Sequence, residues 1–457
     1  MYSIDISKLE KAVNGKIIHK GKHNTVSGVV IDSRLVKEGD VFFALDGTAL
    51  DGHDFVKKAD EKGAACCIVK RFTEQTECFQ IQVEDTLKAL YDMALSYKNE
   101  FDIPFVALTG SAGKTSTKDM VAGVLSKKYN TMKTIGNYNS TTGVPLTLFN
   151  LKKENEIAVI EMGMNHKGEI EKISSLVKPD YAMITNVGVT HIENLGSKEN
   201  IFKAKTEITK GLKKGATLVV NGDNEFFRDY KNDDFKVVKV GIENGDFKAY
   251  DLKFDRKGVS FKVSWQGEEY SFNVNIPANY SVYNGLFAIY TGFHFGLDYE
   301  QIKQGILEFV PSNNRMRIEK LKDFTIIDDT YNSNPDALKE ALSLLSNISG
   351  NNRKVAVLGD MFELGKESER EHYGCGRFLK EKNIDLLLAL GKDSLHIVRG
   401  AVENGFDEER AVYFESKEEL IKNIKSYLSK GDYILFKASR GMAFEDIVKA
   451  VKDGGKN

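Results

Sequence analysis

Short apolar runs, separated by glycine-containing turns and amphipathic helices, recur along most of this chain. Runs of this length between turn residues are typical of strands buried in a parallel sheet. In the middle third of the chain they lie at 105–108, 157–160, 181–187 and 217–220. The pattern predicts a parallel sheet whose strands are joined by crossover helices.

The pattern changes on both sides of this region. The first hundred residues hold shorter runs, at 41–45 and 66–69, which are typical of a small α/β unit. Apolar and polar residues alternate over 259–265 and 270–276, on either side of Gln266-Gly267, which predicts an antiparallel hairpin. From about Pro311 strands and helices alternate again, with strands at 325–327, 354–358, 386–390 and 433–436.

Ligands of open parallel sheets bind beyond the carboxyl ends of the strands. In the last third of the chain we therefore expect chemistry at Asp328-Asp329, Gly359-Asp360 and Ser439-Arg440. This part lacks a second phosphate-binding loop, so we expect it to close over a nucleotide held elsewhere.

Length, charge and cysteine content narrow the class of protein. At ordinary domain sizes, 457 residues predict about three domains. The 64 Lys and Arg residues balance 66 Asp and Glu, which argues against a general nucleic-acid binder or a binder of anionic membranes. Four cysteines without metal-ligand spacing suit a reducing compartment. With no signal-peptide core and no apolar run of membrane-spanning length, we expect a cytoplasmic protein that does not insert into membranes.

The run at 105–108 leads directly into a glycine-containing turn and an amphipathic helix. N–H groups at such a helix N-terminus point at an anion, while Lys114 adds a cation and Thr115 a hydroxyl for Mg²⁺. The spacing is shorter than in the general phosphate-loop motif, and the alternative is a glycine turn with a surface lysine. That alternative does not explain why strand, glycines, lysine and threonine coincide, so we interpret the segment as a nucleotide-binding loop. It comprises Thr109, Gly110, Ser111, Ala112, Gly113, Lys114, Thr115 and Ser116.

Two side chains at analogous strand ends are candidate metal ligands. Glu161 ends the run 157–160, at the position where phosphate-loop proteins often hold Mg²⁺ or its water. His191 follows the run 181–187 and is expected at the same edge of the sheet. The alternatives are a charged strand end and a hydrogen-bonded surface histidine.

Lys205 is the least expected residue of the middle region. On a helix through 201–212 it falls on the same face as the apolar side chains, and lysine is rarely buried without a partner. Burial would leave a free amine that could bind phosphate or react with carbon dioxide to give a carbamate. In the alternative interpretation, the side chain reaches along the surface to water.

Three further polar residues are candidate nucleotide contacts. Asn137 lies in an asparagine-rich turn after the phosphate helix, and Asn284 is a polar residue on a helix whose core face is apolar. Arg315 lies near the start of the last third, where it could reach the nucleotide when that part closes. The alternatives are an ordinary turn, an exposed helix residue and a surface charge.

Taken together, these segments resemble the Mur ligase family, ATP-dependent enzymes that form peptide bonds, over essentially the whole chain. The resemblance is carried by DSR (32–34), GDVFFAL (39–45), DGH (51–53), TGSAGKTS (109–116), GNYNSTTGVP (136–145), EMGMNHKGEI (161–170), ITNVGVTHIENLGS (184–197), KAKTEI (203–208), IDDTYNSNPDAL (327–338), VLGDMFELG (357–365) and KASRGM (437–442).

The resemblance implies an α/β protein of three domains. Residues 1–100 would bind the UDP-sugar end of the substrate, and residues 101–312 would form a central ATP-binding domain with a P-loop ATPase-like parallel sheet and antiparallel side strands. Residues 313–457 would form a Rossmann-like domain that receives the incoming amine.

It also implies a reaction. The chain would join D-alanyl-D-alanine to a UDP-N-acetylmuramoyl-tripeptide through an acyl phosphate, releasing ADP and phosphate, in peptidoglycan precursor synthesis. Three features favour this acceptor over the single amino acids that sister ligases add: EMG with GEI, DDTYNSNP and GDMFELG. The second hypothesis within the enzyme class is a sister ligase that adds a single amino acid to a shorter precursor. The motifs do not distinguish lysine from diaminopimelate as the third residue of the tripeptide. Outside the enzyme class, the competitor is a phosphate-loop switch that hydrolyses ATP only to change shape.

The resemblance assigns roles residue by residue. Lys114 would contact the transferred phosphate, and Thr115 would hold one Mg²⁺ of two. Glu161, His191 and a carbamate on Lys205 would complete the metal sites, with Lys114, Lys205 and His191 as the catalytic set. Nucleotide contacts would come from the loop 109–116 with Asn137, Asn284 at adenine, Asp329 at ribose and Arg315 at phosphate. Substrate contacts would come from Ser33, Arg34, Asn332 and Asn334, in an enzyme expected to be a monomer.

Two positions depart from the family pattern. Asn314 stands where many relatives have glycine, directly before Arg315. Tyr280 replaces a frequent histidine ahead of Asn284. These departures bear on the details of phosphate and adenine contacts and leave the class of enzyme unchanged.

Overall fold

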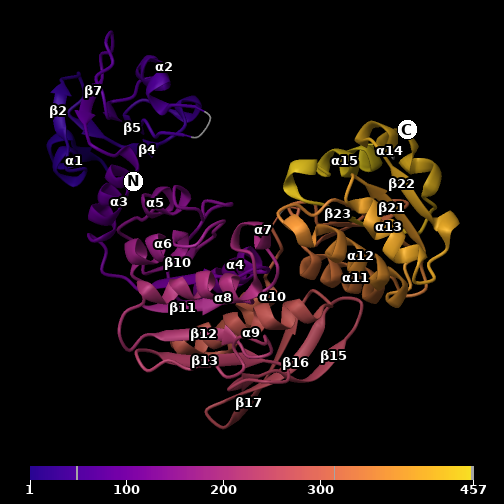
Figure 1. Cartoon of the computed structure of the whole chain (residues 1–457). Coiled ribbons are helices and arrows are strands. Elements are labelled where there is room, and N and C mark those ends of the chain that lie inside the picture. Colours follow the sequence, from indigo (N-terminus) through magenta and orange to yellow (C-terminus); the bar gives the residue numbers. More distant parts are fainter. Residues whose placement is uncertain (48–49, 313, 454–457) are drawn as a thin grey trace.

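The chain forms three α/β bodies in sequence order, and the middle body contacts both of the others (Figure 1). The computed structural model describes residues 1–47, 50–312 and 314–453. The N-terminal body is indigo in Figure 1, the middle body is magenta to salmon, and the C-terminal body is orange to yellow. Residue 313, at our expected boundary between the second and third domains, lies outside the described residues. The domain boundaries therefore stay predictions.

The N-terminal body is built on a five-stranded sheet in the order β2-β7-β6-β5-β4. All neighbouring strands are parallel except β2 and β7, and β1 pairs separately with β3. The strands are β1 (Ile4–Asp5), β2 (Lys16–His19), β3 (Thr25–Val26), β4 (Gly28–Val30), β5 (Asp40–Phe43), β6 (Cys66–Val69) and β7 (Phe79–Gln82). The helices are α1 (Ile6–Ala12), α2 (Val56–Glu61) and α3 (Thr86–Lys98), with short 3₁₀ turns η1 (Ser33–Leu35) and η2 (Gly52–Phe55).

The middle body confirms the predicted parallel sheet. Seven strands, all parallel, lie in the order β14-β13-β12-β11-β8-β10-β9. They are β8 (Phe105–Thr109), β9 (Thr131–Lys133), β10 (Ile157–Glu161), β11 (Tyr181–Ile184), β12 (Thr217–Asn221), β13 (Lys236–Gly241) and β14 (Phe247–Lys248). The helices are α4 (Lys114–Leu125), α5 (Gly143–Leu148), α6 (Glu169–Val177), α7 (Ile192–Leu195), α8 (Lys198–Thr206), α9 (Asn279–His294) and α10 (Tyr299–Leu307), with η3 (Glu207–Lys210) after α8.

The predicted hairpin is confirmed as the edge of a small antiparallel sheet beside the parallel one. Its strands are β15 (Tyr250–Phe254), β16 (Val259–Trp265) and β17 (Glu268–Val274). Val259 pairs with Val274 and Trp265 with Glu268, so that Gln266 and Gly267 make the turn. Both turn residues have positive φ, 52° and 87°, as a two-residue hairpin turn requires.

The C-terminal body holds a six-stranded sheet in the order β18-β19-β23-β20-β21-β22, in which only β18 is antiparallel. Its strands are β18 (Arg317–Lys320), β19 (Thr325–Asp328), β20 (Lys354–Gly359), β21 (Leu386–Leu390), β22 (Ala411–Phe414) and β23 (Tyr433–Lys437). The helices are α11 (Pro335–Ser349), α12 (Ser368–Glu381), α13 (Ser394–Val402), α14 (Lys417–Tyr427) and α15 (Glu445–Asp453), with η4 (Gly365–Glu367), η5 (Glu408–Arg410) and η6 (Arg440–Met442).

The helix expected over 201–212 ends earlier than we predicted. α8 stops at Thr206 and the chain continues as η3. The carboxylate of Glu207, the first residue of η3, accepts hydrogen bonds from the N–H of Gly168 at 2.8 and 2.9 Å. This contact with a distant segment is a tertiary interaction that helix periodicity cannot reveal.

The four cysteines are buried and free. None of the helices in the described part of the chain combines the length and apolar character that a membrane crossing needs. The expected cytoplasmic location stays a prediction.

Candidate functional site

A cavity of about 840 Å³ lies between the middle and C-terminal bodies, at the carboxyl ends of their parallel strands. The structure therefore brings together most of the residues that sequence analysis singled out. Those that line it are Ser111, Ala112, Gly113, Lys114, Thr115, Ser116, Asn137, Glu161, His191, Asn284, Arg315, Asp329, Asn332 and Asn334. Thr109 and Gly110 lie directly before the lining part of the loop, at the end of β8.

The phosphate loop is held in shape by glycine conformations and by Asn186. Gly110 has a φ of 155° and Gly113 a φ of 77°, and Gly113 caps the N-terminus of α4. The side-chain oxygen of Asn186 accepts from the N–H groups of Ser111 (3.0 Å) and Ala112 (2.8 Å). The N–H groups of the first turn of α4, from Lys114 on, have no intrahelical acceptor and can bind an anion.

Asn186 is a functional residue that sequence analysis missed. It lies inside the motif ITNVGVTHIENLGS but carries no signal of its own, because its role depends on a contact with a loop more than seventy residues away.

Lys114 and the carboxylate of Glu161 supply opposite charges at the phosphate loop. Lys114 Nζ donates to the carbonyl oxygen of Gly110 at 2.7 Å. Burial lowers the pKa of the Lys114 ammonium, and Glu161 acts in the opposite direction. A lysine in this place can move its ammonium onto a bound phosphate.

Glu161 is a buried carboxylate, one oxygen of which can accept a further hydrogen bond or bind a cation. Its Oε1 accepts from Thr115 Oγ1 (3.1 Å) and from Asn139 Nδ2 (2.7 Å). Its Oε2 makes no hydrogen bond within the described ranges, although Lys118 Nζ lies 3.9 Å away. A threonine hydroxyl beside a buried carboxylate with a free oxygen suits a hard divalent cation such as Mg²⁺, so this donor set fits the expected metal.

His191 reaches the same cavity from the end of the β11 loop. It caps α7 with a left-handed backbone, φ 63°. Its Nδ1 lies 2.6 Å from Oε2 of Glu363, a residue of the C-terminal body. Nδ1 makes no hydrogen bond of ordinary angular geometry to the residues that the structure describes, so its closest polar contact is with the carboxylate of Glu363.

Lys205 is completely buried, which rules out the alternative that its side chain reaches water. No described group hydrogen-bonds to its Nζ. Burial lowers its pKa well below the ordinary value of a lysine, and the Lys114 ammonium adds to the shift. The residues lining the cavity, within the part of the chain described, do not include Lys205. An unpartnered amine whose neutral form is favoured by burial fits the chemistry of carbamate formation.

The cavity also carries polar groups suited to a nucleoside. Asn284 is 5% exposed, so the alternative of an exposed helix residue is wrong. Its Oδ1 accepts from Thr117 Oγ1 at 2.9 Å, while its Nδ2 lacks a partner among the described atoms. A buried amide donor of this kind suits the edge of a base.

Asp329 and Arg315 line the cavity from the C-terminal part of the chain. Asp329 forms a buried ion pair with Lys437, and its Oδ1 accepts from the N–H of Met316 at 3.1 Å. Burial raises the pKa of Asp329, and Lys437 opposes that shift. The guanidinium of Arg315 stacks 3.8 Å from the ring centre of Tyr331. Asn314 has a φ of 61°, a conformation that asparagine tolerates best after glycine, which explains the departure from the family's glycine.

The four expected substrate residues fall in two places. Asn334 caps α11 by accepting from Ala337 N–H (2.9 Å), and its Nδ2 donates to Thr190 Oγ1 (3.0 Å) across the two bodies. Asn332 Oδ1 accepts from Arg440 N–H at 3.3 Å. Ser33, which is buried, and Arg34, which is exposed and paired with Asp32, lie in η1 of the N-terminal body, outside the cavity lining as far as the structure describes it.

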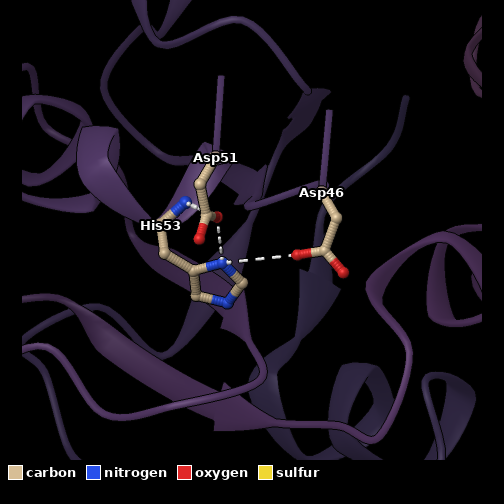
Figure 2. Close-up of side chains that lie close together, drawn as sticks. All are labelled: Asp46, Asp51 and His53. Atoms are coloured by element: carbon tan, nitrogen blue, oxygen red, sulfur yellow. Dashed lines mark hydrogen bonds and ion pairs between the residues drawn. The ribbon is translucent and has the colours of Figure 1, made fainter. Parts of the chain in front are cut away.

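Figure 2 shows a second cluster of possible ligands, in the N-terminal body. His53 Nδ1 lies 2.7 Å from Asp51 and 3.8 Å from Asp46. The backbone N–H of Lys70 donates to His53 Nε2 at 2.8 Å, so the proton of the neutral ring is on Nδ1 and points toward Asp51. Both ring nitrogens are thus occupied, and we interpret the cluster as a structural brace rather than a metal site.

Comparisons with known proteins agree with this geometry. Family models match residues 25–98 (Mur ligase family, catalytic domain), 108–292 (Mur ligase middle domain) and 314–440 (Mur ligase, glutamate ligase domain). The UDP-N-acetylmuramoyl-tripeptide–D-alanyl-D-alanine ligase of Bacillus subtilis is 37% identical, over 97% of both chains. The enzyme of the same name from Escherichia coli is 33% identical, over the whole of both chains.

Solved structures of similar proteins have the same fold. A crystal structure of MurF from Acinetobacter baumannii superposes with a TM-score of 0.89 at 28% identity, covering 99% of both chains. The MurF ligase of Thermotoga maritima, solved in complex with ADP, gives 0.83 at 27% identity and covers 94% of this chain and 97% of its own.

Proposed function

The chain belongs to the Mur ligase family, and we propose that it joins D-alanyl-D-alanine to UDP-N-acetylmuramoyl-tripeptide, converting ATP to ADP and phosphate, in peptidoglycan synthesis. The observation that carries this function is that the phosphate loop and Glu161 of the middle body line the same cavity as Asp329 and Asn332 of the C-terminal body. Nucleotide and acceptor can meet there.

In the proposed reaction the terminal carboxylate of the tripeptide attacks the γ-phosphorus of ATP, and ADP leaves. The amine of D-alanyl-D-alanine then attacks the carbonyl carbon of the acyl phosphate, phosphate leaves, and the amine loses its proton. Lys114 neutralises charge on the transferred phosphoryl group, and the N-terminus of α4 holds the phosphates. Closure of the C-terminal body keeps water from the acyl phosphate.

Mg²⁺ is the expected metal, and we propose two sites for it. Thr115 would serve the first, while Glu161 and His191 would serve the second, with a carbamate on Lys205 as a further oxygen donor. The metal would supply positive charge for the phosphate oxygens when bound. The free Oε2 of Glu161 and the unpartnered amine of Lys205 support this assignment.

We assign the remaining residues by their place in the fold. Asn284 would bind adenine, Asp329 ribose and Arg315 phosphate, with Asn137 beside the phosphate loop. Asn332 and Asn334 would face the acceptor side of the cavity, and Ser33 with Arg34 the UDP end of the substrate. Residues 1–100, 101–312 and 313–457 would be the three domains. We also propose a monomeric state and roles in cell shape and cell division.

The test is whether ADP release depends on both acceptors. With nucleotide-sugar tripeptide, D-alanyl-D-alanine and ATP present, we expect rapid release of ADP, and omission of either acceptor should reduce it to background. Release that ignores both acceptors would instead support the phosphate-loop switch. Release with a single amino acid in place of the dipeptide would support a sister ligase.

A further inference from the structure

A short loop of the C-terminal body is fixed by hydrogen bonds and reaches His191, a residue of the cavity lining. It follows β20 and covers residues 360–365. Asp360 Oδ1 accepts from the N–H (2.7 Å) and hydroxyl (2.8 Å) of Ser394. The N–H of Met361 donates to His372 Nε2 at 2.9 Å, and that of Phe362 to Ser439 Oγ at 2.8 Å. These bonds fix the loop within its own body and leave Glu363 at its tip.

The tip docks on the middle body beside His191. The carbonyl oxygen of Glu363 accepts from the N–H of Glu193 at 3.2 Å. A Cβ on Gly365 would lie 3.2 Å from Glu193 Cβ, so the two segments touch closely. Glu363 itself has a left-handed backbone, φ 64°, which costs a non-glycine residue free energy and persists only when surrounding contacts hold it.

This arrangement places the carboxylate of Glu363 2.6 Å from Nδ1 of His191. A negative charge so close to Nδ1 repels a lone pair there and favours the ring form with the proton on that nitrogen. Nε2 then keeps its lone pair and can bind a cation. Histidines that bind metals commonly give their other N–H to a carboxylate, which fixes ring orientation and raises ligand basicity.

We propose that Glu363 is a positioning residue that prepares His191 for the divalent cation, so that docking of the C-terminal body completes the metal site. The inference rests on the proposed function, in which His191 is a metal ligand. It deepens that function by making metal affinity depend on a residue from another body. Sequence analysis included Glu363 in the motif GDMFELG (359–365) but gave it no role of its own, because the contact joins segments that are remote in sequence.

The first test measures cation affinity directly. Mn²⁺, as a probe for Mg²⁺, is titrated into the full chain with ADP, and free Mn²⁺ is followed by electron paramagnetic resonance. For Glu363→Ala we expect binding weaker by about 10- to 100-fold, the usual effect of removing such a carboxylate. Glu363→Gln keeps a neutral acceptor oxygen and should fall between the alanine variant and the wild type.

A matched control is Glu367→Gln, the same change four residues further on. Glu367 pairs with Arg370 within the C-terminal body and does not line the described cavity. It should bind Mn²⁺ like the wild type. Thermal unfolding of each variant checks that the fold is kept. We expect it to be kept because the side chain of Glu363 is half-exposed.

The second measurement separates positioning from direct ligation. Ring ¹⁵N resonances report which nitrogen carries the proton, and the His191 signal among the 8 histidines is assigned by its loss in His191→Gln. At about pH 8 the wild type should show the Nδ1–H form and Glu363→Ala a shift toward Nε2–H. Unchanged Mn²⁺ affinity, or weakened affinity with an unchanged ring form, would overturn the proposal. Neither measurement uses an acceptor substrate, so a failure of the proposed reaction would appear separately, in the ADP-release assay.

Discussion

At the scale of single residues, the environment of Lys205 indicates a chemical role more strongly than that of any other residue we considered outside the cavity lining. It is a fully buried lysine whose amine has no partner among the described residues. Burial removes the solvent that stabilises an ammonium, so the neutral amine is favoured and is open to carbon dioxide. A carbamate would restore a negative charge that a neighbouring cation can use.

Replacement of Lys205 by alanine should therefore remove most activity. We expect a loss of at least about 100-fold, comparable with loss of a strong electrostatic contact in an active site. A short carboxylic acid such as acetate, added to the assay, should restore part of the activity because its carboxylate can enter the space left by the side chain. The measurement is the initial rate of ADP release with both acceptors.

Lys203→Ala serves as the matched control, since Lys203 is an exposed lysine on the same helix. It should keep wild-type activity and show no response to acetate. Full activity of Lys205→Ala without additive would contradict the carbamate.

At the scale of elements, the turn between β8 and α4 depends on glycine at its first position. Gly110 has a φ of 155°, and a Cβ there would lie 1.9 Å from Oγ1 of Thr185. That hydroxyl is fixed by its bond to the carbonyl oxygen of Ala112 at 2.7 Å. A side chain at Gly110 must therefore displace the loop that faces the phosphates.

We expect Gly110→Ala to weaken ADP binding by at least about tenfold, equivalent to about 1.4 kcal/mol. Isothermal titration calorimetry with ADP and Mg²⁺ measures this. Gly374→Ala places the same methyl group in open space on α12 and should bind ADP like the wild type. Equal affinities for the two variants would show that the turn tolerates a side chain at Gly110.

Comparison of the predicted with the observed strands shows which elements the sequence alone could predict. The runs predicted as strands correspond to β5, β6, β8, β10, β11, β12, β16, β17, β19, β20, β21 and β23, because each is a continuous or alternating apolar run. β13 was not predicted, since Lys236 and Lys239 interrupt its valines at the outer part of the sheet. Contacts of Asn186 and Glu363 could not be predicted, because each joins distant segments and leaves no local pattern.

At the scale of the whole molecule, the cavity belongs to two bodies while the far face of the N-terminal body lies outside it. The apolar cluster on that face includes Phe42, Cys67 and Val69. It shares no residues with the cavity lining. The free energy of nucleotide binding should therefore slow hydrogen exchange of backbone amides in some parts of the chain and not in others.

Hydrogen exchange with mass spectrometry can measure this. With ADP and Mg²⁺ at about 100 times the dissociation constant, states that open the binding site become less favourable by about 2.7 kcal/mol. We expect slower exchange in α4, α7 and the loop 360–365, and unchanged exchange in β5 and β6. Equal protection of all these segments would indicate that the bodies open together.

Helix α3 shows why the N-terminal body is not an independent module. It packs against α1, β5 and β6 on its own side and against α5 and α6 of the middle body. Its buried side chains, such as Leu90, Met93 and Tyr97, belong to one apolar cluster that continues into the middle sheet. A chimera that takes its first hundred residues from a relative should therefore fold only if α5 and α6 of the recipient carry a surface complementary to α3. The contact of α3 with α5 and α6 thus restricts which N-terminal bodies and middle bodies can be combined in one chain.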